Sequence, residues 1–147
     1  MKEDIIIYRK SGTVWLVFYD MFSPTRQLRA DIWISRYQLV KQGKTLFPTF
    51  FSSKYWLFEA QDLLILEAFT SELDPNSIEF VRQIKRCLVL IDFPKSRYAT
   101  FSSITGGYFE DLRLQEGVLI YNKHYPTYTQ EMEVHINELT FSKLNPT

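Results

Sequence analysis

The chain has 147 residues, the length of one domain of ordinary size. Hydrophobic residues make up 46% of it, with only five glycines and six prolines, so the composition excludes a disordered or collagen-like chain. Seventeen basic side chains balance seventeen acidic ones, and this zero net charge argues against nucleic acid or a membrane surface as the partner.

The compartment is indicated by the cysteine content and by the N-terminus. The single cysteine, Cys87, excludes an internal disulfide and is typical of a reducing compartment. The apolar run at residues 5–8 is too short for a secretory signal and is not followed by a cleavage site. No apolar run is long enough to span a bilayer as a helix. We therefore expect a cytoplasmic protein in which residues 1–147 form a single domain.

Side chains alternate with a period of two over much of the first seventy residues, which predicts β-strands. Gly43 marks a turn, and the pair Gln61–Asp62 is expected to form a tight connection between two strands. The predicted strands of this part cover residues 13–22, 30–37, 55–60 and 63–69.

One helix is predicted, near residues 75–86. Asp74 suits the N-cap position, and Pro75 suits the first helical position, where a missing N–H group is tolerated. Apolar residues then follow at helical spacing, at Ile78, Val81 and Ile84. Residues 87–93 form an apolar run that predicts a buried strand directly after this helix.

The last third of the chain is predicted to consist of consecutive strands. These cover residues 97–104, 108–114, 118–125 and 129–139. Gly106–Gly107 suits a two-residue hairpin turn, and Gly117 marks a second hairpin. In the last strand, apolar residues such as Met132 and Val134 alternate with Glu131 and Glu133, so one face is expected to be solvated. The fold predicted for the whole chain is an antiparallel β-sandwich or barrel of about nine to ten strands with one covering helix.

Motifs for catalysis or cofactor binding are missing from the sequence. The glycine pair Gly106–Gly107 is not followed by the Lys-Ser/Thr of a phosphate-binding loop, and no Gly-x-Ser-x-Gly elbow occurs. A single cysteine cannot form a Cys-x-x-Cys metal or redox site, and Cys87 lies in an apolar run typical of an inert core thiol. We therefore predict no catalytic residue, no metal and no cofactor.

The two histidines are expected at opposite ends of one hairpin. His124 lies near the turn at Pro126–Thr127, whereas His135 lies toward the far end of the returning strand. This separation is too large for one metal ion or one acid–base pair. Glu131, Glu133 and His135 share a face, but successive members are nearly 7 Å apart, so one metal would need ligands from other strands.

One stretch of the chain is distinctly acidic. Residues 55–81 carry six acidic side chains and no basic one, whereas residues 1–54 carry nine basic and four acidic ones. Aromatic anchors beside carboxylates are typical of a protein-binding surface that steers a basic partner. The predicted partner-binding residues are Tyr55, Trp56, Glu59, Asp62, Glu67 and Glu72.

Three functions remain open at this point. The first is a non-catalytic cytoplasmic protein-binding module. Bacterial immunity proteins, which block toxin domains, share this general character, and the expected partner would be a basic toxin or nuclease domain. The second is a small β-barrel that binds a hydrophobic ligand, and the third is a small hydrolase that uses His124 or His135. Neither nucleic acid nor a membrane is an expected partner, and the sequence is compatible with a homodimer.

Overall fold

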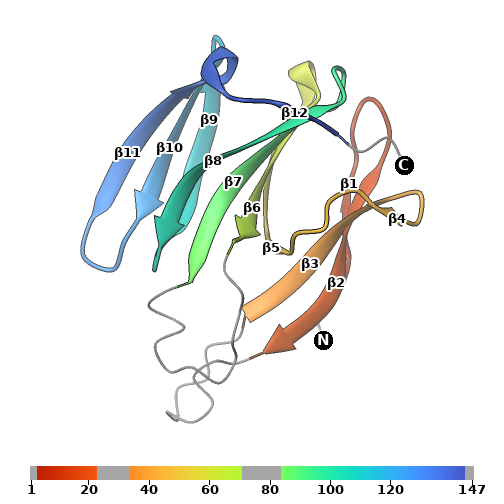
Figure 1. Cartoon of the computed structure of the whole chain (residues 1–147), viewed down its shortest axis with the longest axis horizontal. Helices are drawn as coiled ribbons and strands as arrows, with labels where there is room; N and C mark the ends of the chain where they lie inside the picture. The colour runs from red at the N-terminus through yellow and green to blue at the C-terminus, as the bar shows by residue number, and fades with distance from the viewer. Residues whose placement is uncertain (1–2, 23–33, 71–83, 145–147) are drawn as a thin grey trace.

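The computed structural model describes residues 3–22, 34–70 and 84–144, which form twelve strands in two antiparallel sheets (Figure 1). The larger sheet has nine strands in the order β1-β2-β3-β5-β6-β7-β8-β12, with β4 paired to β3. The smaller sheet has the order β11-β10-β9. The mainly-β, antiparallel architecture predicted from the alternating side chains is therefore confirmed.

The strands follow one another along the chain with short connections. The large sheet contains β1 (Ile5–Ile7), β2 (Val14–Phe22), β3 (Ile34–Lys41), β4 (Lys44–Thr45), β5 (Phe51–Phe58), β6 (Leu63–Phe69), β7 (Lys85–Asp92), β8 (Arg97–Thr105) and β12 (Ser142–Lys143). The small sheet contains β9 (Tyr108–Gln115), β10 (Val118–His124) and β11 (Thr129–His135). Two short 3-10 turns are η2 (Glu59–Gln61), between β5 and β6, and η3 (Ile136–Glu138), after β11.

The described strands form two open sheets and no closed barrel. The pairing path of the large sheet starts at β1 and ends at β12, and these two strands do not pair with each other. In Figure 1 the small sheet lies beside β7 and β8, while the large sheet continues away from it toward β2 and β1. Among the described residues, no helix has the length and apolar character needed to cross a membrane.

Strands β6 and β7 separate two hydrophobic cores. All seven residues of β6 are buried, because successive side chains enter opposite cores. The first core lies on the face that β6 and β7 share with β2, β3 and β5, and it includes Leu16, Phe51 and Leu66. The second core lies between the other face and the small sheet, and it includes Ile65 and Tyr121. Cover on both faces explains why β6 and β7 are apolar without alternation.

Gly106–Gly107 does not form the predicted hairpin. Strand β8 pairs with β7 and β12, whereas β9 pairs with β10, so the glycine pair carries the chain from one sheet to the other. The Gly106 N–H donates to the carbonyl oxygen of Ile84 at 2.8 Å. A Cβ atom on Gly107 would collide with the carbonyl oxygen of His124 on β10. Close approach of the two sheets thus requires a glycine here.

The predicted covering helix is not confirmed. Its residues 75–83 lie outside the described residues, as does the predicted strand at residues 30–33. The prediction is wrong for Lys85 and Arg86, which begin strand β7 and pair with Thr105 and Ile104 of β8. Backbone hydrogen bonds to β8 override the local helical spacing at this point.

Candidate partner-binding surface

The two aromatic residues of the predicted site lie on opposite faces of β5. Trp56 packs against the second core, together with Phe58. Tyr55 is 38% exposed, and the next residue, Leu57, packs against the first core on the same side of the strand as Tyr55. The structure therefore does not bring Tyr55 and Trp56 together into one aromatic surface.

Asp62 is buried and binds residues near the N-terminus. It adopts a left-handed backbone conformation (φ 52°) directly after η2. Its carboxylate accepts a hydrogen bond from the Ser11 hydroxyl and lies 3.4 Å from Nη1 of Arg9. The Arg9 guanidinium stacks 3.3 Å from the ring centre of Phe93. Burial lowers the pKa of Arg9, and the charge of Asp62 opposes this change. The pair therefore fastens the end of β1 to the β5–β6 connection.

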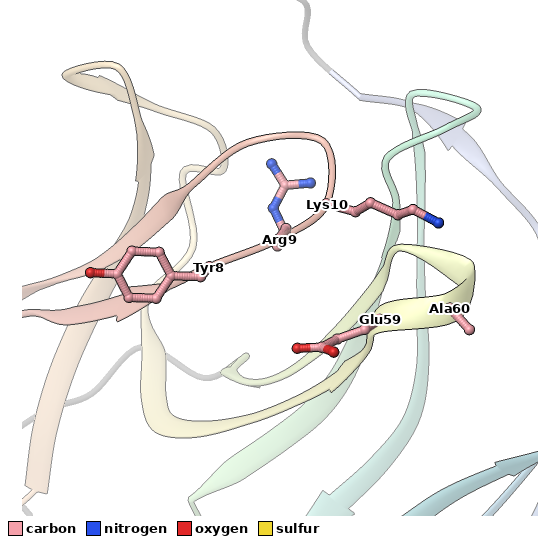
Figure 2. Close-up of a pocket in the computed structure, with 5 residues that line it drawn as sticks. All are labelled: Tyr8, Arg9, Lys10, Glu59 and Ala60. Atoms are coloured by element: carbon pink, nitrogen blue, oxygen red, sulfur yellow. The ribbon is translucent and has the colours of Figure 1, made fainter.

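A shallow pocket lies between this N-terminal segment and η2 (Figure 2). Its lining residues are Tyr8, Arg9, Lys10, Glu59 and Ala60. In Figure 2 the guanidinium of Arg9 points away from Glu59. Glu59 is exposed, but it shares the pocket with Lys10, so this region is of mixed charge rather than acidic.

Glu67 is only 2% exposed and links β6 to the small sheet. One carboxylate oxygen accepts the N–H of Phe109 at 3.0 Å, and the other lies 3.5 Å from Nε of Arg86. Arg86 in turn donates from Nη1 to the carbonyl oxygen of Gly107 at 2.6 Å. Desolvation lowers the pKa of Arg86, and the charge of Glu67 opposes it. Glu67 thus acts inside the protein, while Glu72 lies outside the described residues.

Exposed carboxylates gather instead on the small sheet, on the side away from the second core. We call this side the acidic outer face and define it by Glu110, Asp111, Glu131 and Glu133. The side chains of Asp111 and Glu131 are 60% and 62% exposed. Within the described small sheet, Arg113 is the one arginine or lysine on this face, because Lys123 points the other way and binds the carbonyl oxygen of Ser103.

A β-bulge in β9 concentrates charge at one end of this face. The pairing with β10 shifts between Ile120 and Asn122, and Asp111 has a positive φ of 57°. Asn122 donates from Nδ2 to Asp111 at 3.1 Å. His124 Nε2 lies 3.7 Å from Glu110 and 4.0 Å from Asp111. The bulge therefore places two consecutive carboxylates beside one imidazole.

A shallow apolar depression lies at the other end of the same face. Val118 and Ile120 of β10 are partly exposed there. Glu133 on β11 and Glu116 in the β9–β10 turn border it. Apolar side chains surrounded by carboxylates are a suitable contact for a basic protein surface with an apolar centre.

The geometry around the histidines gives little support to catalysis. His124 Nδ1 lies 3.1 Å from the Thr129 hydroxyl, but the carboxylate oxygens near Nε2 are beyond the hydrogen-bond range of about 2.6–3.2 Å that proton transfer needs. His135 pairs with Val118 at the opposite end of the hairpin from His124, which confirms the predicted separation. No group of three or more His, Cys, Asp or Glu side chains in the described part of the chain is arranged to hold a metal ion.

Comparison of the chain with protein-family models, curated proteins and solved structures found no match.

Proposed function

We propose that this chain is a non-catalytic protein-binding module that recognises a basic protein partner through the acidic outer face. The observation that carries this proposal is the imbalance of charge on one sheet face, where four exposed carboxylates accompany a single arginine. Such a face accelerates encounter with a basic surface and disfavours acidic ones. The neighbouring Val118 and Ile120 supply apolar area for the complex.

The partner class that this chemistry suits is a toxin or nuclease domain with a basic substrate groove. A nuclease must gather arginines and lysines to bind phosphates, so its groove is complementary to a face of carboxylates. A module that covers the groove blocks the substrate, as an immunity protein does. This proposal keeps the function predicted from the sequence and moves its surface from residues 55–72 to the small sheet.

A carrier of hydrophobic ligands receives less support from the first core. Leu16, Leu39 and Phe51 have no accessible surface, so no void large enough for a water molecule borders them. An apolar ligand needs a cavity lined by such residues. The described part of this core is instead filled by its own side chains.

The proposed function is tested by capture of host proteins on the immobilised chain and on two variants. The face variant carries Glu110→Gln, Glu131→Gln and Glu133→Gln. The control variant makes the same change of charge elsewhere, with Glu3→Gln, Glu59→Gln and Glu138→Gln, all at exposed positions. Captured proteins are identified and quantified by mass spectrometry.

We expect a basic polypeptide that is retained by the wild-type chain and by the control variant but lost from the face variant. Its retention should also fall as salt is added, because salt screens exposed charges. Equal retention by the face variant would contradict the assignment to the acidic outer face. Loss from the control variant alone would favour the region around Glu59.

A further inference from the structure

We propose that the open edge of β11 is a strand-addition site, at which an extended basic segment of the partner pairs with β11 through the backbone. This inference rests on the proposed function and adds the mode of binding to it. Strand addition obtains affinity from main-chain hydrogen bonds and specificity from alternate side chains.

Strand β11 stands at the end of the small sheet. It pairs with β10 along all of its seven residues, from His124–Thr129 to Val118–His135, without a register shift. No described strand pairs with its other side, which forms the outer edge of the small sheet in Figure 1. The edge is thus regular over its whole length.

Hydrogen bonds at the two ends of the hairpin define which backbone groups face this edge. The Tyr125 N–H donates to the carbonyl oxygen of Tyr128, and the Ile136 N–H donates to that of Gly117. Both pairs continue the register of the β10–β11 ladder. Hydrogen-bonded and non-hydrogen-bonded pairs alternate in an antiparallel ladder. The residues of β11 that turn their N–H and C=O groups outward are therefore Thr129, Glu131, Glu133 and His135.

The same residues also carry the exposed side chains of β11. In an added antiparallel strand, the residues opposite Glu131 and Glu133 extend over the acidic outer face, so lysine or arginine is favoured there. The intervening residues lie beside Met132 and Val134, which pack against the second core. The segment that fits is therefore extended, with basic and apolar residues in alternation.

A second copy of this chain fits the edge poorly. In the antiparallel register centred on Met132, Glu131 of each copy faces Glu133 of the other. The two adjacent symmetric registers place Glu131 against Glu131, or Glu133 against Glu133. Like charges directly opposite each other destabilise a strand pair. The glutamates thus select against self-association and in favour of a basic strand.

Most open edges are protected by lysine, proline or a bulge, and β11 has none of these. Its only charged residues besides His135 are Glu131 and Glu133. Arg113 lies 3.9 Å from Glu131, but both side chains are more than half exposed, so this ion pair is weak and can be replaced. The edge is therefore open to one kind of strand and closed to acidic ones.

The test uses a synthetic peptide with this pattern, acetyl-Thr-Lys-Val-Lys-Val-Thr-amide, and two N-methylated versions. Methylation of both lysine nitrogens removes the N–H groups that would bond to β11. Methylation of both valine nitrogens removes N–H groups that would point away from β11, and it leaves charge and composition matched. Binding to the full-length protein is followed by amide NMR titration, together with hydrogen exchange at Glu131 and Glu133.

We expect the lysine-methylated peptide to bind about tenfold more weakly than the other two, since each lost hydrogen bond contributes a factor of this order. Exchange of the Glu131 and Glu133 amides should slow when the unmodified peptide is bound. Equal binding of all three peptides, with unchanged exchange and shifts confined to the acidic outer face, would overturn strand addition and leave the proposed function intact. No binding of any peptide would also overturn strand addition, and capture of the intact partner would then judge the proposed function by itself.

Discussion

Two carboxylates, Glu67 and Asp62, hold separate parts of the fold together from the inside. Glu67 connects β6 to Arg86 and to the backbone of Phe109, while Asp62 connects the β5–β6 turn to Arg9. Removing one member of a buried ion pair leaves the other charge desolvated and unpaired, which costs more than the pair contributes. These residues are therefore expected to influence stability rather than recognition.

The Glu67→Ala variant should lower the free energy of unfolding by about 3–5 kcal/mol, because it leaves Arg86 and the Phe109 N–H without their partner. Urea denaturation measures this change. The Glu131→Ala variant removes an exposed carboxylate and should stay within about 0.5 kcal/mol of the wild type. A small effect of both changes would contradict the structural role of Glu67.

Cys87 should behave as an inert thiol. Burial, with a smaller contribution from the charge of Glu67, raises its pKa from 9.0 to about 11. Because the fold favours the neutral thiol, the stability that it contributes is fully present below pH 9.0 and is lost as the pH rises toward 11. At about pH 8.5, iodoacetamide should alkylate the unfolded chain much faster than the folded one. Equal rates would contradict the burial of this side chain.

At the scale of strands and turns, local pattern predicted much, and long-range pairing decided the rest. The alternation that predicted strands at residues 13–22 and 129–139 is confirmed by β2 and β11, because side-chain period is a local property. The partner of each strand is not a local property. Gly106–Gly107 therefore resembled a hairpin turn, although β8 and β9 belong to different sheets.

Hydrogen exchange of β11 should show an alternating pattern. The amides of Met132 and Val134 bond to β10, whereas those of Glu131 and Glu133 face the open edge. We expect slow exchange at the first two and fast exchange at the second two, as measured by NMR in the free protein. Slow exchange at all four amides would show that the edge is covered, and would contradict its availability to a partner.

The Gly107→Ala variant should destabilise the contact between the two sheets. Its Cβ atom would collide with the His124 carbonyl oxygen and lie 2.7 Å from Cδ1 of Ile104. Gly43→Ala is the matched control, because its Cβ atom would meet open space and only its φ of 76° is unfavourable. The control should cost about 1 kcal/mol in thermal or urea unfolding, and Gly107→Ala distinctly more. Equal costs would contradict the close approach of β9 and β10 at this glycine.

At the scale of the whole molecule, the position of charge along the chain differs from its position on the surface. The acidic stretch at residues 55–81 suggested one surface, yet Asp62 and Glu67 are buried and neighbouring side chains of β5 face opposite ways. The acidic outer face was not identified, because its carboxylates come from two strands separated by β10. The usable signal was the hairpin pattern of residues 108–135 combined with the alternation of its charges.

The most direct test of protein binding is native mass spectrometry of the full-length chain isolated gently from its own host. A protein-binding module should carry a basic polypeptide, and the face variant with Glu110→Gln, Glu131→Gln and Glu133→Gln should lack it. A wild-type mass increased only by a small molecule of about a few hundred daltons, and released on denaturation, would contradict this function and favour a ligand carrier.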